Sequence, residues 1–399
     1  MGILLMNIIA FAMPEVAYIN PLAWGGTEPA DIIAWAVNFI LVDGKMRGLF
    51  SLLFGASMLL VMERARAAGE DEQSVHVRRM GWLLIFGLAH YYLLWYGDIL
   101  FTYAICGFVA MVFAHMEPRR LLRWSIGLFA VNFIGWVALL GSMIALKWSA
   151  LQPGADADTL NSYAELVASI GLPDAESLAS EINLHHGSYG LIVADKLTVG
   201  LFRPVIFFFY SAVETLALML LGMALMKTGF MAGGWSAARY RRAAVTCYAI
   251  GLPAMALLAW WCWSSGFDAV TTFGATFAWS APFRPLLAIG HAAVALLLIN
   301  RFAGTAIVTR IAAAGRAAFT NYLGTSIVMT AIFYGYGLGL YGEISRAAAY
   351  LFVLGGWIVM LAWSKPWLDR FAYGPFEWLW RSLARGKIQP FRRSSSIAT

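Results

Sequence analysis

Charged side chains are scarce in this sequence: Asp, Glu, Lys and Arg make up 13% of its 399 residues, and hydrophobic residues make up 61%. A soluble domain of average composition carries about 25% charged residues, so this composition excludes an ordinary soluble enzyme and indicates an integral membrane protein. The three cysteines all lie inside apolar runs, which excludes a disulfide framework or a cysteine-based metal cluster. The net charge of +6 indicates no nucleic-acid partner, because the basic residues fall in short loops between apolar runs.

The motifs of soluble enzymes are missing as well. The sequence has no P-loop, no Gly-rich dinucleotide turn, no His-Glu-x-x-His metal motif and no Gly-x-Ser-x-Gly nucleophile elbow. His185 and His186 are adjacent, so their side chains point in different directions, and no metal site is predicted. Any chemistry must therefore rest on polar side chains within or beside the apolar runs, where each is costly unless it is paired.

Apolar runs dominate the chain and predict an all-α, polytopic bundle of about ten transmembrane helices. The loops after the second, fourth, sixth, eighth and tenth runs are basic, whereas those after the fifth and seventh are acidic or nearly neutral. The positive-inside rule then places both termini in the cytoplasm. The expected location is the inner (plasma) membrane of a bacterium. The runs cover residues 2–13, 48–62, 80–96, 99–115, 124–148, 204–226, 243–263, 285–299, 317–338 and 347–363.

The domain organisation follows from these runs. Residues 1–372 are predicted to form a transmembrane helical domain. Within it, residues 148–200 form one acidic extracytoplasmic loop region, with short helices expected around Thr159–Ile170 and Asp174–Asn183. Residues 373–399 are predicted to form a cytoplasmic amphipathic helix and tail, because a helix from Tyr373 to Arg385 would carry Trp and Leu on one side and Arg on the other.

The stretch from Arg78 to Cys106 is an apolar run interrupted at Gly97-Asp98, which predicts a membrane hairpin with Asp98 at its outer tip. His90 and Asp98 are eight residues apart and share a helix face if the helix continues that far. A histidine inside a span is a functional candidate, here a general base oriented by the carboxylate of Asp98. The alternative is a packed histidine bonded to a neighbouring helix.

Other polar residues are expected to share the outward-facing site. Lys45 and Arg47 lie at the outer end of their span, against the usual bias for basic residues, so an anionic partner is expected: Asp43, Asp98 or a developing oxyanion. Glu214 is a lone carboxylate in mid-span and must be either protonated or paired. The predicted catalytic residues are Asn7, Lys45, His90 and Asp98, and the predicted substrate-binding residues are Asp43, Arg47 and Glu214.

A second, inward-facing group contains Arg316, followed by Asn321 and Tyr322. Arginine suits bidentate phosphate contact, so these three residues are candidates for binding a phosphorylated cofactor or donor at the cytoplasmic face. The alternative is that membrane topology alone accounts for the basic residues in this region.

Several stretches resemble the DUF418 family, also called the YeiB-like membrane proteins. They run from end to end of the chain in family order: GILLMNIIAF, PEVAYINPLAWGG, DGKMRGLFSLLFGAS, FGLAHYYLLWYGDILFTYAICG, LMLLGMALMKTGF, GRAAFTNYLGTS, YGLGLYG and GPFEWLWR. That family is grouped with transmembrane acyltransferases, which resemble the lysosomal heparan glucosaminide acetyltransferase. The resemblance implies transfer of an acyl group from cytoplasmic acyl-CoA or acetyl-CoA to an acceptor outside.

The sequence departs from the family pattern at two places. Family members usually carry an L-D-x-x-R-G motif just before the first apolar run, whereas Met1 follows that point, so the start is expected to lie upstream or the motif is absent. The acetyltransferase relatives carry an active histidine in the loop after the first span. This chain has Tyr18, Asn20 and Trp24 there, and only Asn7 has a counterpart.

Three hypotheses follow. The first is an acyltransferase with His90 as base, Lys45 and Arg47 stabilising the oxyanion, and an acyl-CoA donor near Arg316, without a metal. The second is a transporter or lipid-handling protein without covalent chemistry, in which the buried charges line a pathway. The third is a structural partner of another membrane complex. The expected partners are membrane lipids and an acceptor of unidentified chemistry, and a homodimer is a candidate assembly.

Overall fold

The computed structural model describes residues 1–392, and this part of the chain is helical throughout apart from short connections. The first half contains α1 (Gly2–Ala12), α2 (Val16–Ile19), α3 (Pro29–Val37), π-helix η1 (Asn38–Val42), α4 (Lys45–Ala67), α5 (Glu72–Leu93), α6 (Leu100–Met111), α7 (Pro118–Ala150), α8 (Ala157–Ile170), α9 (Ala175–His185) and α10 (Tyr189–Thr198). The second half contains α11 (Arg203–Lys227), α12 (Ala237–Ser264), α13 (Ala269–Phe273), π-helix η2 (Gly274–Trp279), α14 (Phe283–Arg301), α15 (Ala306–Arg316), α16 (Ala318–Phe333), α17 (Arg346–Arg370) and α18 (Pro375–Arg385). The prediction of an all-α protein is confirmed.

Six helices in the described part are long and apolar enough to cross a membrane. One is the stretch Pro29–Ala67, which comprises α3, η1 and α4 and is interrupted at Asp43 and Gly44, and the others are α7, α11, α12, α14 and α17. The apolar helices α1, α6 and α16 are shorter, at 10–17 residues. The six candidates support an integral membrane protein, since a span needs about 20 predominantly apolar residues.

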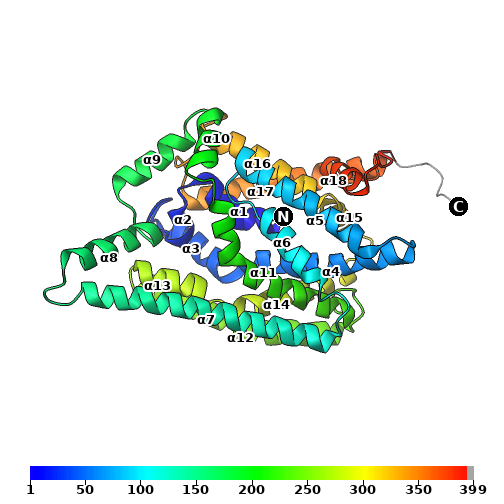
Figure 1. The fold of residues 1–399 in the computed structure, drawn as a ribbon, viewed down its shortest axis with the longest axis horizontal. Helices are drawn as coiled ribbons and strands as arrows, with labels where there is room; N and C mark the ends of the chain where they lie inside the picture. Colours follow the sequence, from blue (N-terminus) through cyan, green and yellow to red (C-terminus); the bar gives the residue numbers. More distant parts are fainter. Residues whose placement is uncertain (393–399) are drawn as a thin grey trace.

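The long helices lie side by side, and the polar segment lies at one end of them. Figure 1 shows α8 and α9 at the left end of the molecule and α18 at the right end, with the long helices α7 and α12 running between. The two short helices predicted in the acidic segment are confirmed as α8 and α9, and α10 is a third. Asp156 and Asp174 cap α8 and α9, because their carboxylates accept hydrogen bonds from the backbone N–H of Thr159 and Ser177.

Glycine permits a close helix crossing between α4 and α11. A Cβ atom on Gly55 would lie 2.1 Å from the backbone oxygen of Met219, and a Cβ atom on Gly222 would lie 2.1 Å from that of Leu52. No other residue fits at either position without moving the helices apart. This crossing fixes the relative positions of the polar side chains that α4 and α11 carry.

Helix α1 lies inside the bundle. Ile8, Ile9, Phe11 and Ala12 are buried, and α1 contacts α4, η1, α16 and α17. The ring of Phe11 stacks on the indole of Trp95 with 3.9 Å between their centroids. The N-terminal helix is therefore a central element around which distant parts of the sequence assemble.

Helix α18 is amphipathic, as predicted, and one of its faces packs against α5 and α16. The Trp380 indole N–H donates to the backbone oxygen of Arg79 at 3.0 Å, and the Arg79 guanidinium lies 4.3 Å from the centre of the Trp380 ring. The Glu377 carboxylate accepts hydrogen bonds from the backbone N–H of Phe319 and Thr320, which satisfies the first turn of α16. These contacts tie α18 to the start of α16.

Candidate functional site

His90 lies between a carboxylate and a hydroxyl in a hydrogen-bonded relay. Its Nδ1 is 2.9 Å from Asp98 Oδ1, and its Nε2 is 2.8 Å from the Ser326 hydroxyl. All three residues are buried, with 1%, 6% and 1% of their surfaces exposed for His90, Asp98 and Ser326. A neutral imidazole that donates from Nδ1 to the carboxylate leaves Nε2 able to accept the serine proton, which the backbone oxygen of Tyr322 can also accept, at 3.4 Å from the Ser326 hydroxyl. This is the arrangement of an aspartate–histidine–serine triad.

The position of Asp98 differs from the predicted one. Helix α5 ends at Leu93 and the chain turns back, so Asp98 meets His90 from a loop and not from the same helix face. Asp98 is also buried. Its second oxygen, Oδ2, accepts the backbone N–H of Phe101 at 2.8 Å, which holds the carboxylate at the start of α6. The turn after α5 thus brings His90 and Asp98 together, and not their spacing on one helix as expected.

Ser326 lines a largely apolar cavity of about 770 Å³, bounded by α1, α4, α5, α6, α15, α16, α17 and α18. The cavity reaches from Ser326 and Tyr322 in α16 to Arg79 and Trp380, where α5 meets α18. Ligand pockets typically have volumes of about 300–1,000 Å³, so an extended organic molecule fits. The relay serine therefore lies at the wall of a chamber of ligand size.

Asn7 also lines this cavity, and its side-chain amide forms no hydrogen bond within residues 1–392. It is buried, with 6% of its surface exposed. An amide N–H that faces a cavity without a partner is available to a ligand oxygen. The structure thus places three of the predicted site residues, Asn7, His90 and Asp98, at or directly behind one cavity wall.

Of the three residues predicted to bind the acyl donor, two line the cavity and one does not. Tyr322 lines the cavity, with its ring centroid 5.0 Å from that of His90. Asn321 lines it too, but its amide is occupied: Nδ2 donates to Ala314 and Ser364, and Oδ1 accepts from Trp363. Arg316 is exposed at the end of α15 and does not line the cavity, although the preceding residue does.

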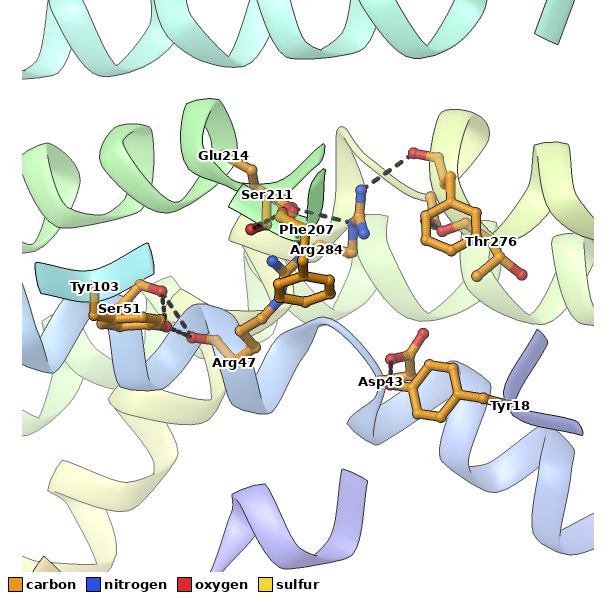
Figure 2. Close-up of polar contacts among 12 residues, drawn as sticks. Tyr18, Asp43, Arg47, Ser51, Tyr103, Phe207, Ser211, Glu214, Thr276 and Arg284 are labelled. Carbon is orange, nitrogen blue, oxygen red and sulfur yellow. Dashed lines mark hydrogen bonds and ion pairs between the residues drawn. The ribbon is translucent and has the colours of Figure 1, made fainter. Parts of the chain in front are cut away.

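A second polar cluster surrounds Glu214 in α11. The Arg47 guanidinium lies 2.5 Å from Glu214 Oε2, and the Arg284 Nε lies 3.2 Å from Glu214 Oε1. All three side chains are mostly buried. Figure 2 shows the two guanidinium groups converging on this carboxylate from different helices. Of the two expectations for Glu214, the structure shows the paired one. The anionic partner of Arg47 is Glu214, and not Asp43 or Asp98 as expected.

Lys45 and Asp43 lie beside this cluster. The Lys45 ammonium is buried and donates to the backbone oxygen of Phe39 at 2.6 Å, while Asp43 accepts a hydrogen bond from Tyr18 (Figure 2). Lys45 and Arg47 therefore do not contact His90. Tyr103 connects the two regions, because it lines the cavity and its hydroxyl donates to the backbone oxygen of Arg47 at 3.3 Å.

A separate polar pocket of about 530 Å³ lies among α2, α5, α9, α10 and α11. It is lined by five carboxylates, Glu15, Asp174, Glu176, Glu181 and Asp195, and by the cations Lys196 and Arg203. Burial raises the pKa of Glu181 and lowers the pKa of Lys196 to about 8. His185 stacks on Tyr341 with 4.1 Å between centroids, and burial lowers its pKa to about 4.

Aromatic rings connect the cavity with this polar pocket. Phe11 lines the cavity, Tyr96 lines the pocket, and Trp95 contacts both rings, at centroid distances of 3.9 Å and 5.5 Å. The same indole lies 6.3 Å from the His90 ring. The Asp98–His90–Ser326 relay therefore lies next to the aromatic rings that separate the apolar cavity from the polar pocket.

Three important residues were not predicted: Ser326, Arg284 and Arg79. No neighbouring residues in the sequence mark Ser326 as part of a site, because its partner His90 is 236 residues away. Arg284 could have been found, since it is a basic residue at the end of a connection predicted to face outward, like Lys45 and Arg47. Arg79 lies just before an apolar run, where membrane topology alone accounts for a basic residue. Within residues 1–392 no group of three or more His, Cys, Asp or Glu side chains is placed to hold a metal ion.

The chain is similar to proteins without an assigned function. The family described as "Protein of unknown function (DUF418)" matches residues 225–387. The Bacillus subtilis protein YxaH is 30% identical over 99% of this chain and 94% of its own length, and the Escherichia coli protein YeiB is 31% identical over 96% and 92%. Both are described as uncharacterized. No solved structure matches the chain.

Proposed function

The chain belongs to the DUF418 family and is an integral membrane protein, and from that premise we propose that it transfers an acyl group from cytoplasmic acyl-CoA to an acceptor outside the cytoplasm. The observation that carries the proposal is the buried Asp98–His90–Ser326 relay at the wall of the 770 Å³ cavity. A hydroxyl paired with a histidine that a carboxylate orients is an activated nucleophile. The apolar chamber beside it is suited to a flexible, weakly polar substrate.

The chemistry has two steps. His90 Nε2 removes the proton of Ser326 as Oγ attacks the thioester carbonyl; the carbon–sulfur bond breaks, and the leaving thiolate takes the proton from His90. An acceptor hydroxyl or amine then attacks the carbonyl carbon of the seryl ester and loses its proton to His90; the bond from that carbon to Ser326 Oγ breaks, and His90 returns the proton to Oγ. The Asn7 amide is the candidate donor to the oxyanion of each step, in place of Lys45 and Arg47, which are engaged elsewhere.

The proposed topology has ten spans in an inner membrane, with both termini in the cytoplasm. It adds α1, α5, α6 and α16 to the six long candidates, and all four of these helices line the cavity. The pocket near α9 and α10 then faces the outside and admits the acceptor, while the end of the cavity near α18 faces the cytoplasm. The acceptor reaches Ser326 only when the Phe11–Trp95 stack opens.

The test is turnover of radiolabelled acyl-CoA by the purified protein, together with mass spectrometry of the acylated serine. Ser326→Ala and His90→Gln should abolish both thiol release and labelling. Ser57→Ala is the matched control, because Ser57 lines the same cavity but bonds only to the backbone oxygen of Phe54. Equal rates in the wild-type protein and the two relay variants would reject the assignment.

Transport without covalent chemistry is the second candidate, and the helix breaks favour it. The chain leaves helical geometry at Asp43 and Gly44, between η1 and α4, and again between η2 and α14. Lys45, which lies beside the Glu214 cluster, and Arg284, which belongs to it, follow these breaks. Broken helices at buried charges are a feature of transporter sites.

Side-specific labelling separates the two candidates. A single cysteine at position 211, one turn from Glu214, would be introduced after replacement of Cys106, Cys247 and Cys262. Reactivity that switches between the two sides of a vesicle favours transport. Reactivity from one side, combined with thiol release from acyl-CoA, favours the enzyme.

A further inference from the structure

Three arginines gather where the cavity meets α18. Arg79 lines the cavity, and its guanidinium lies against Trp380. Arg381 directly follows Trp380 in α18 and Arg385 lies one turn further along, on the helix that packs against the α5 segment carrying Arg79. Arg381 itself lies over the ring of Tyr373, at 4.5 Å from its centre. Aromatic faces thus hold two of the three guanidinium groups in place while leaving their N–H donors unused.

None of these arginines forms an ion pair within residues 1–392, in contrast to Arg47, Arg66, Arg203 and Arg284. The carboxylate of α18 itself, Glu377, is not available, because it accepts hydrogen bonds from the backbone N–H of Phe319 and Thr320 and from the Thr320 hydroxyl. Three like charges held together without a counter-ion repel one another. An anion with several oxygen atoms would relieve that repulsion and use the free donors.

The distance from these arginines to the relay restricts the anion. Arg79 and His90 belong to the same helix, eleven residues apart, which corresponds to about 16 Å at 1.5 Å per residue. In a phospholipid the ester carbonyls are only a few bonds from the phosphate, so they would stop far short of Ser326. A phosphopantetheine thioester carries its reactive carbonyl at the end of an extended arm of comparable length to this separation.

We propose that Arg79, Arg381 and Arg385 form a phosphate-binding site for coenzyme A, and that the pantetheine arm occupies the cavity with its thioester at Ser326. This inference rests on the proposed function for the identity of the reacting group. The site replaces the predicted donor site at Arg316 and Asn321, since Arg316 is outside the cavity and the amide of Asn321 is fully engaged. Tyr322 retains a place along the arm.

The experiment measures binding of free coenzyme A, which needs no turnover, to the purified full-length protein in detergent by calorimetry. The variants are Arg79→Gln and the double variant Arg381→Gln/Arg385→Gln, and the matched control is Arg119→Gln/Arg120→Gln, two exposed arginines at the start of α7. Each lost charge-assisted contact should weaken binding about tenfold. The control should bind like the wild-type protein. Binding of phosphatidylglycerol in nanodiscs and of inorganic phosphate is measured with the same variants for comparison.

The outcomes separate this inference from the proposed function. Arginine-dependent binding of coenzyme A supports the site even if no acyl group is transferred, in which case only the proposed function fails. Binding of coenzyme A that the arginine variants leave unchanged overturns the site, even if Ser326-dependent turnover is observed. Retention of phosphatidylglycerol through these arginines, with no binding of coenzyme A, would overturn the thioester donor. If the Arg79 variant misfolds, the α18 double variant decides the question.

Discussion

Replacing Glu214 with glutamine should destabilise the protein strongly, because it removes the one carboxylate that Arg47 and Arg284 share. The Glu214 and Arg284 side chains are only 4% and 6% exposed, and that of Arg47 is 15% exposed. The change keeps the size of the side chain but leaves two buried guanidinium groups without a counter-charge. Breaking a buried pair by removing one partner costs about 3–5 kcal/mol, and here one carboxylate serves two partners.

The measurement is thermal unfolding of the detergent-solubilised protein, followed by tryptophan fluorescence and by retention of the monodisperse peak. We expect the midpoint to fall by roughly 5 °C or more. Glu28→Gln is the control, because Glu28 is exposed and its side chain does not cap α3. The double variant Glu214→Gln/Arg284→Gln should be less destabilised than the sum of its single variants, since it removes one unpaired charge. A midpoint for Glu214→Gln within a degree of the Glu28 control would refute the view that this cluster stabilises the fold.

Three other perturbations give distinct results. Asp98→Asn should lower acyl turnover about 10⁴-fold while leaving donor binding unchanged, because the amide no longer holds His90 in the tautomer that accepts a proton; single-turnover kinetics measure the loss. Gly222→Ala should cost about 1–3 kcal/mol in a denaturant titration, because its Cβ atom would lie 2.1 Å from the Leu52 oxygen. His185→Phe should reduce the loss of thermal stability between pH 7 and pH 5. In the folded protein burial lowers the pKa of His185 to about 4, so the unfolded chain binds more protons below about pH 6.5 and stability falls as the pH falls.

The features that the sequence predicts well are local ones. The helices between residues 157 and 185 and the amphipathic helix at 375–385 follow from capping residues and from the spacing of apolar side chains, which depend only on neighbouring residues. Apolar composition likewise identifies the six long helices without any knowledge of their packing.

The site is harder to predict because its contacts join distant parts of the chain. His90 and Asp98 are close in sequence and were paired correctly, although the expected helix stops after Leu93. Ser326 meets His90 across 236 residues, and Glu214 meets Arg47 across 167. The spacing of apolar residues along the chain contains no information about such contacts. The negative charge expected beside Arg47 was therefore placed on Asp43 or Asp98, which are nearer in sequence than Glu214.

The buried position of α1 has a consequence for biosynthesis. Its contacts with α16 and α17 join the first twelve residues to helices that begin at Ala318 and Arg346. At about 5–20 residues per second, a ribosome needs roughly 15–70 s to add the intervening chain. During that interval the apolar surface of α1 lacks its final neighbours and must be shielded by lipid, by the insertion machinery or by a temporary helix partner. The cavity wall is therefore completed last, and a chain interrupted before α16 cannot enclose it.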